Sequence, residues 1–202
     1  RPERLKHLYL RLPKRQSCPE LLPSINHSVQ RFVNLRRFDF HCENDSALAA
    51  SVVCSAALAC KRLETASFEA FVATDEQCKT LSKATPLKRL KCHAESGQQF
   101  SWDYPKTSHV EILTLVFYPP LPVVPWSGFP QLRKLKIAML EIGNPSALLA
   151  SLDEISQLSV LWLRFHFHKI VQPWPEIKMS RAPLTSLTIG AWHRVVYVHL
   201  LL

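Results

Sequence analysis

A six-residue phrase recurs eight times along this chain: an apolar residue, two variable residues, an apolar residue, one variable residue and a final apolar residue. Its copies begin at Leu5, Leu35, Leu63, Leu87, Val110, Leu132, Leu158 and Leu184. Successive copies are 22 to 30 residues apart. Self-similarity at this period is typical of solenoid proteins, in which each repeat adds one unit to a continuous stack. The repeat therefore constrains the fold before any single residue is considered.

The spacing within the phrase predicts a strand. We number the repeat from the first apolar residue of the phrase, so that the apolar residues occupy positions 1, 4 and 6. Side chains alternate along a strand, so positions 4 and 6 share one face, while position 1 enters the same core from the preceding bend. Only Ala66 and Cys92 fit the phrase weakly. Because such a repeat buries its apolar residues only against its neighbours, we predict one stacked sheet of about eight strands.

The phrase is the strand consensus of leucine-rich-repeat proteins, and the chain resembles that family from Leu5 to nearly its last residue. The family usually has Asn or Cys at position 9, where this chain has Pro13, Glu43, Phe71, Glu95, Tyr118, Leu140, His166 and Trp192. In this respect it looks more like the irregular repeats of intracellular eukaryotic proteins, such as F-box receptors of ubiquitin ligases and nucleotide-binding immune receptors. The resemblance implies an α/β solenoid with a curved parallel sheet on the concave face and helices and extended segments on the convex face.

The connections between phrases are of two kinds. Helices are predicted from about Asp45 to Cys60, from Thr74 to about Ala84 and from Asn144 through Ile155, with a weaker candidate from Ser24 to Val33. Prolines exclude long helices from two other connections, at Pro119, Pro120, Pro122, Pro125 and Pro130 and at Pro173, Pro175 and Pro183. Those connections are expected to be extended.

Length and composition favour a single leucine-rich-repeat domain over residues 1–202. Hydrophobic residues make up 47% of the 202 residues, enough for a continuous core, and no linker divides the chain. Solenoids need capping elements, yet the first phrase starts at Leu5 and the chain ends in an apolar run at Leu202. We therefore expect the sequence to be a fragment of a longer protein.

Cysteine usage bears on the compartment. The six cysteines show no paired framework, which favours a reduced intracellular setting, cytoplasmic or nuclear. Two glycosylation sequons, at Asn26 and Asn44, point the other way. No apolar stretch approaches the 18 or more residues that a membrane-spanning helix requires.

The chain has a formal net charge of +9, and many of its basic residues recur at the same positions of the repeat. Positions 2, 3, 5, 7 and 8 are expected to form the solvent-facing strand surface. The basic residues at these positions are Lys6, Arg11, Arg36, Arg37, Lys88, Arg89, Lys91, Arg133, Lys134, Lys136 and Arg164, against the acids Asp39, Glu64, Glu69 and Glu111. A clustered positive face attracts acidic partners, although such residues also serve simply to solvate a rim.

Trp162 and Arg164 lie on the same phrase, and aromatic and arginine residues are common anchors of protein interfaces. Ile112, Val116, Phe117 and Met139 are expected to extend a semi-apolar patch around them, unless Phe117 and Phe165 turn inward. The candidate partner-binding residues are therefore Lys6, Arg36, Arg37, Lys88, Arg89, Lys91, Arg133, Lys134, Lys136, Trp162 and Arg164.

Motifs of catalysis and metal binding are missing from the sequence. Nine histidines and six cysteines include no CxxC or HxxxH pair, and there is no phosphate loop, GxSxG elbow or HExxH helix. We expect no enzyme activity, no cofactor and no metal. An acidic protein segment is the expected partner, and nucleic acid is less favoured because no recognition motif or regular stacking platform is present.

The resemblance and the charge together favour the substrate-binding region of an F-box-like ubiquitin-ligase receptor. The alternatives are the sensor region of a nucleotide-binding immune receptor, to which FPQLRKLKI and APLTSLTI are similar, and a basic scaffold for RNA or anionic surfaces.

Overall fold

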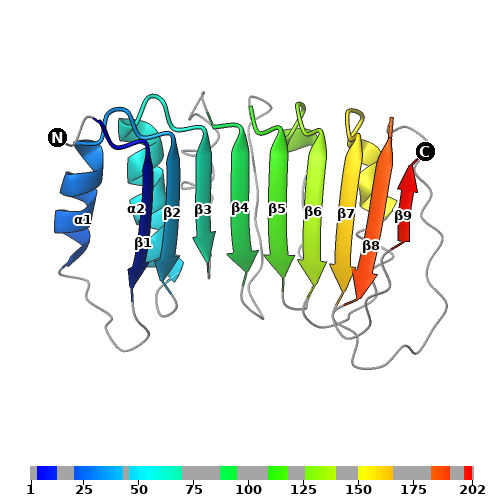
Figure 1. Ribbon diagram of the computed structural model, residues 1–202, viewed down its shortest axis with the longest axis horizontal. Helices are drawn as coiled ribbons and strands as arrows, with labels where there is room; N and C mark the ends of the chain where they lie inside the picture. Colours follow the sequence, from blue (N-terminus) through cyan, green and yellow to red (C-terminus); the bar gives the residue numbers. More distant parts are fainter. Residues whose placement is uncertain are drawn as a thin grey trace.

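The computed structural model describes residues 4–12, 21–42, 46–69, 87–94, 109–117, 126–139, 150–165, 183–191 and 198–201. Within these ranges the chain forms one nine-stranded sheet whose strands follow one another in sequence order (Figure 1). The strands are β1 His7–Leu12, β2 Arg37–Cys42, β3 Thr65–Glu69, β4 Arg89–Ala94, β5 Ile112–Phe117, β6 Lys134–Met139, β7 Val160–Phe165, β8 Ser186–Ala191 and β9 Val198–Leu201. The first eight strands are parallel, and β9 pairs antiparallel with β8.

Each of the eight parallel strands begins at position 3 of a phrase, which confirms the predicted strand in every repeat. Neighbouring strands pair equal positions, as in Leu8 with Phe38 and Leu161 with Leu187. The repeat therefore produces rows of side chains that run across the sheet, one row for each position. This order and register form the open α/β solenoid that the leucine-rich-repeat phrase predicts.

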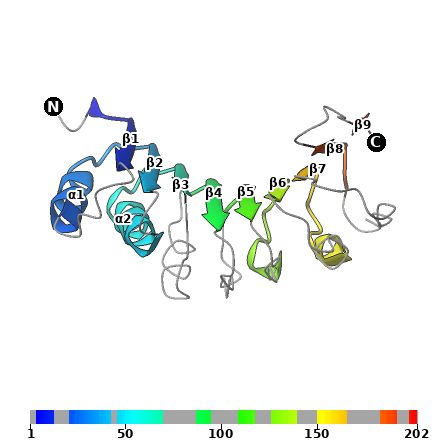
Figure 2. The same cartoon turned by 90° about the horizontal axis from the view of Figure 1, so that it is seen from below.

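The helices lie on one side of this sheet. They are α1 Leu21–Gln30 and α2 Ser46–Ala59, and short 3₁₀ turns follow at η2 Trp126–Gly128 and η3 Leu152–Glu154. Figure 2 shows the row of strands bending away from the helices, so that the helix-free face of the sheet is concave. The predicted convex helices and concave sheet are therefore confirmed for the described repeats.

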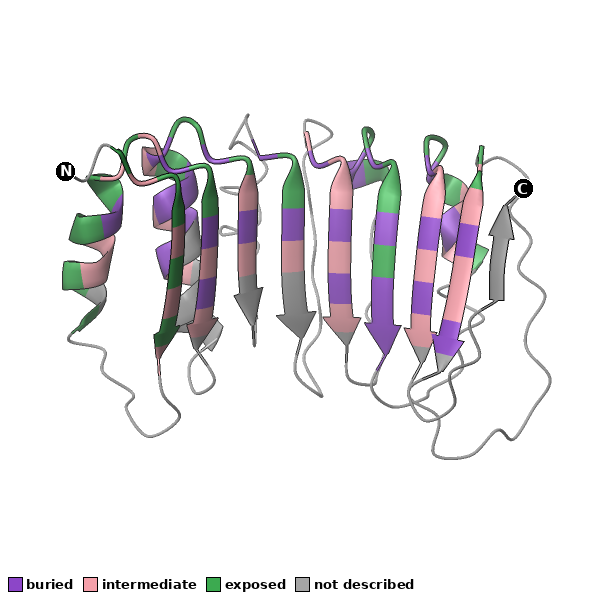
Figure 3. Cartoon of the chain, in the orientation of Figure 1, coloured by how far each residue is buried: buried purple, intermediate pink, exposed green. Residues whose placement is uncertain are grey.

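The core lies between the sheet and the convex layer. Described residues at positions 4 and 6 are mostly buried, and those at positions 3 and 5 are half-buried or exposed, which gives the alternating bands in Figure 3. Ala66, a weak fit to the phrase, is fully buried beside Phe38. Met139 at position 8 is only 4% exposed and belongs to the core, so its predicted place in a surface patch is wrong. Alternation explains this, because position 8 shares the inward face with positions 4 and 6.

A backbone ladder joins the repeats just before the strands. The carbonyl of Lys6 accepts hydrogen bonds from the N–H groups of Arg36 (2.8 Å) and Arg37 (3.0 Å) in the next repeat. The same paired arrangement recurs at all seven junctions between the parallel strands. Because the ladder satisfies backbone groups without any side chain, the residue at position 2 is free to vary.

A tight turn also recurs before the strands. The N–H of position 1 donates to the carbonyl three residues earlier at Leu35, Leu63, Leu132 and Leu158. The accepting residues are Phe32, Cys60, Phe129 and Ile155, of which the last three are buried. These residues add one more apolar position to the repeat, three residues before the phrase begins, a regularity that was not predicted from the sequence.

One of the predicted helices is confirmed, one was misplaced, and the others lie largely outside the described residues. The helix expected from Asp45 to Cys60 is confirmed as α2. The weaker candidate from Ser24 to Val33 was placed too late, because α1 starts at Leu21 with Pro23 in its first turn, where proline is tolerated. The helix expected at Thr74 and most of the one expected at Asn144 lie outside the described residues, as do most of the proline-rich connections.

Candidate functional site

The concave face consists of the side chains at positions 3, 5 and 7 of β1 to β8, and Figure 1 looks directly onto it. Seven of the eleven predicted partner-binding residues lie there: Arg37, Arg89, Lys91, Lys134, Lys136, Trp162 and Arg164. Parallel pairing in register brings these residues, which are up to 127 positions apart in the chain, onto one surface.

At positions 3 and 5 of β2 to β6, strands that carry cations alternate with strands that carry none. At position 3 the cations are Arg37 on β2, Arg89 on β4 and Lys134 on β6, and at position 5 they are Lys91 and Lys136. The intervening strands carry Thr65 and Ser67 on β3 and Ile112 and Thr114 on β5 at the same positions. At positions 3 and 5 of β2 to β6, every second strand therefore presents positive charge and the strands between carry uncharged side chains, whereas Arg11 on β1 and Arg164 on β7 lie at position 7.

A shallow hollow of about 390 Å³ opens on the N-terminal half of the concave face. Its lining residues are Tyr9, Arg37, Asp39, Phe40, His41, Thr65, Ala66, Ser67, Arg89, Leu90, Lys91, Ile112 and Thr114. The hollow follows from side-chain size, because the short Thr65 and Ser67 stand between the longer side chains of β2 and β4. Tyr9 borders it with 63% of its surface exposed.

The charge in the hollow is partly compensated. Arg37 Nε lies 2.6 Å from Asp39 Oδ2, an ion pair on one strand. With that pair neutral, Arg89 leaves the hollow positive. Only three lining residues, Arg37, Arg89 and Lys91, were predicted as partner-binding residues, and the solvent-facing ones that were missed include Tyr9, His41, Thr65, Ser67 and Thr114. The small residues at positions 3 and 5 of LETASF, between two phrases with long side chains, were the available signal.

The other four predicted residues, Lys6, Arg36, Lys88 and Arg133, lie at position 2 on the edge where the strands begin. Arg36 Nη1 lies 3.6 Å from Glu64 Oε1, and Lys88 Nζ lies 3.8 Å from Glu111 Oε1. Each pair joins neighbouring repeats at equal positions. These side chains are between 37% and 60% exposed, and such pairs contribute about 1 kcal/mol or less.

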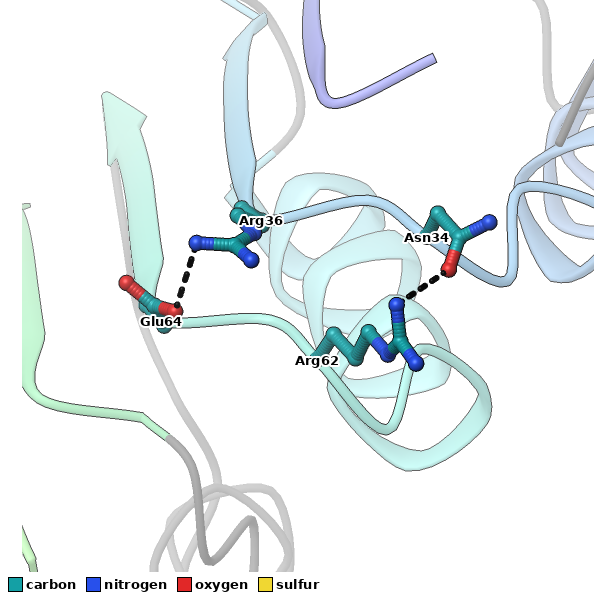
Figure 4. Close-up of polar contacts among 4 residues, drawn as sticks. All are labelled: Asn34, Arg36, Arg62 and Glu64. Carbon is teal, nitrogen blue, oxygen red and sulfur yellow. Dashed lines mark hydrogen bonds and ion pairs between the residues drawn. The ribbon is translucent and has the colours of Figure 1, made fainter. Parts of the chain in front are cut away.

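Equal positions meet elsewhere on this edge as well. Arg62 Nη1 donates to Asn34 Oδ1 at 2.9 Å, one residue before the phrase in each repeat (Figure 4). Figure 4 also shows the Arg36–Glu64 pair on the same pair of repeats. At this edge, several polar side chains contact the neighbouring repeat. In this the edge differs from the concave face, where Arg89, Lys134 and Lys136 make no such ion pair within the described residues.

The C-terminal half of the concave face is more apolar. Trp162 lies half-buried at position 5 of β7, in register beside Lys136 of β6. Ile112, Val116 and Val160 are also half-buried on this face, as predicted for the first two. The side chains of Phe117 and Phe165 are outside the described set. Trp162 therefore borders both the apolar surface and the cations of β6.

Cys54 and Cys60 are buried cysteines of the convex layer that take part in no disulfide. The Cys60 thiol lies 3.7 Å from the carbonyl oxygen of Val29, and burial raises the pKa of this thiol. Among the described residues, no group of three or more His, Cys, Asp or Glu side chains is arranged to hold a metal ion. Within the same ranges, no helix is long and apolar enough to span a membrane.

Comparison with known proteins found no matching family model and no matching curated protein. Among solved structures, a chain in the crystal structure of the TLR13–ssRNA13 complex is similar, with 17% sequence identity and a TM-score of 0.39. The similarity covers 80% of this chain and 21% of that chain, so the present chain spans about a fifth of its length. The strand order, the register and the sequence repeat of this chain are what define it as a solenoid.

Proposed function

We propose that this chain is a protein-recognition module that binds an acidic segment of a partner on its concave face. The observation that supports the proposal is the set of cations that parallel pairing aligns on β2, β4 and β6. Within the described ranges, Arg89, Lys134 and Lys136 have no carboxylate within ion-pair distance, in contrast to Arg36 and Lys88 on the edge. A positive surface of this kind accelerates encounter with acidic partners and orients them.

The size of the face suits a protein partner. Eight strands about 4.8 Å apart, each about 20 Å long, provide a surface of about 700 Å². A standard protein interface buries about 800 Å² on each partner. Trp162 provides an aromatic side chain beside the cations, a combination that is typical of residues dominating interface energy.

We further propose that the protein containing this chain uses it as the substrate-binding region of an F-box-like ubiquitin-ligase receptor in the cytoplasm or nucleus. The support is the resemblance of the irregular phrases to that class. The coding sequence upstream of residue 1 tests this assignment. An F-box-like helical motif there would favour it, and a nucleotide-binding domain with a phosphate loop would replace it with an immune-receptor sensor.

A basic scaffold for RNA is the second candidate, because the same aligned cations suit phosphates. Fluorescence anisotropy with a labelled acidic peptide and a labelled single-stranded RNA, from about 50 to 500 mM salt, separates the two. Phosphate binding releases counterions and weakens steeply with salt, whereas contact with Trp162 does not depend on charge. A peptide that binds, and that loses affinity in a Trp162→Ala variant, supports protein recognition. Binding of RNA alone would reject it.

The cations are tested with a matched pair of variants. Arg89→Glu combined with Lys134→Glu changes the charge of the concave face by four units. Arg31→Glu combined with Lys61→Glu makes the same change at exposed turns that precede the strands. We expect the first variant to lose at least tenfold in peptide affinity and the second to lose less than threefold. Equal losses would show that only net charge matters, and the site would then be wrong.

A further inference from the structure

Three cations of the concave face form a right angle across β4 to β6, and we call them the cation frame. Arg89 lies at position 3 of β4, and Lys134 and Lys136 lie at positions 3 and 5 of β6. β5 separates Arg89 from the two lysines and carries the uncharged Ile112 and Thr114 at positions 3 and 5. The register therefore determines both sides of the frame.

The two sides differ in length. Positions 3 and 5 of one strand are about 6.6 Å apart, because each residue advances about 3.3 Å. Arg89 on β4 and Lys134 on β6 are two strand spacings apart, about 9.6 Å between their backbones. A ligand that crosses the strands matches this backbone spacing when its negative charges are about 9.6 Å apart.

The backbone of the strands around the frame is engaged in strand pairing on both sides. β4, β5 and β6 each pair with a strand on both sides, so this region offers no unpaired strand edge. A peptide bound here cannot be added as a further strand and must be held by side chains. A ligand whose own backbone stays hydrated is therefore favoured.

A polyproline II helix has these properties. It has three residues per turn, a rise of about 3.1 Å and no internal hydrogen bonds, so every third side chain projects from the same side at intervals of about 9.3 Å. In an extended β-strand the equivalent step is about 6.6 Å, which matches the short side of the frame but not the direction across the strands. Proline-rich segments also dock against aromatic side chains, and Trp162 lies beside Lys136 on the next strand.

We infer that the concave face binds an acidic polyproline II segment that crosses β4, β5 and β6 and carries a carboxylate at every third residue. One carboxylate lies against Arg89 and the next between Lys134 and Lys136, while the residues between them pass over Ile112 and lead to Trp162. The inference rests on the proposed protein-recognition function and specifies its ligand. Preorganisation of the segment lowers the entropy lost on binding.

The test compares three labelled nonapeptides of equal charge with the 202-residue chain by fluorescence anisotropy. In the first, Glu-Pro-Pro is repeated three times; in the second, three consecutive glutamates precede six prolines; in the third, three glutamates alternate with threonine before three prolines. We expect the first to bind at least tenfold more tightly than the other two. Arg89→Gln with Lys134→Gln should remove most of that preference, whereas Arg31→Gln with Lys61→Gln should preserve it.

Each outcome separates the inference from the proposed function. Equal binding of the spaced and clustered peptides would overturn the spacing and leave recognition of acidic segments intact. Tightest binding of the alternating peptide would indicate an extended ligand and would also overturn it. If none of the peptides binds while a nine-nucleotide single-stranded RNA does, both the inference and the proposed function fail. Circular dichroism of every variant ensures that a lost affinity does not reflect unfolding.

Discussion

Replacing Ser151 by alanine tests whether a hydrogen bond between neighbouring convex connections stabilises the solenoid. Trp126 is 1% exposed, and its indole Nε1 donates to Ser151 Oγ at 2.8 Å. The substitution leaves this buried donor without its acceptor, which costs about 1–3 kcal/mol. For a domain of this length, each 1 kcal/mol lowers Tm by about 2–4 °C. We therefore expect Ser151→Ala to lower Tm by about 2–12 °C.

A double-mutant cycle isolates the hydrogen bond from packing. Trp126→Phe removes the donor and retains an aromatic ring. In that background Ser151→Ala should cost less than about 0.5 kcal/mol, because no indole N–H remains to be satisfied. Ser127→Ala is the control, since Ser127 is exposed in the same turn and its loss should change stability by no more than about 0.5 kcal/mol.

The free energies come from urea unfolding followed by far-ultraviolet circular dichroism, because Trp126→Phe alters tryptophan fluorescence. A loss of about 1–3 kcal/mol in the parent chain and almost none in the Trp126→Phe background supports the reasoning. An equal loss in both backgrounds would refute it and would show that the two connections are held by packing alone.

Four further predictions concern the core, the edge and the buried thiol. Ala66→Leu should destabilise by about 1–3 kcal/mol, because Ala66 is fully buried beside Phe38; a higher urea midpoint would instead indicate unfilled space. Glu64→Gln should change stability by less than about 1 kcal/mol, since its partner Arg36 is 53% exposed, and a Tm loss above about 5 °C would contradict this. Cys60 should react with iodoacetamide far more slowly in the folded chain than in urea, as measured by mass spectrometry, and similar rates would contradict its burial. Because burial raises the pKa of Cys60, its contribution to stability should be intact below the unfolded-state pKa and decline as pH rises above it.

The sheet was predictable because its information is local and repeated. Each parallel strand begins at the same position of its phrase. Stacking then brings equal positions of neighbouring strands together, as it does for Leu113 and Leu135. β9 was not predicted, because no phrase precedes it and it runs antiparallel. α1 was placed too late because the apolar periodicity around Ser24 does not mark where a helix begins, and Pro23 was not recognised as a first-turn residue.

The composition of the concave face was only partly predictable. The phrase identified which side chains leave the core, so Arg89, Lys134 and Trp162 were assigned to the correct surface. It did not distinguish the edge at position 2 from the concave face at position 3, because that distinction depends on where the chain enters the strand. It also missed the hollow, whose shape comes from short side chains such as Ser67 beside long ones on adjacent strands.

The carbonyl ladder has a consequence for how such a chain changes by duplication and deletion. Every junction uses the same two N–H groups and one carbonyl, so a whole repeat can be removed or inserted without leaving a backbone group unpaired at the new junction. Losing the repeat that contains β5 would bring β4 and β6 together and reduce the interval between their cations from about 9.6 Å to about 4.8 Å. Gain or loss of single repeats would then retune the charge spacing of the surface in steps of one strand, while the architecture that carries it stayed the same.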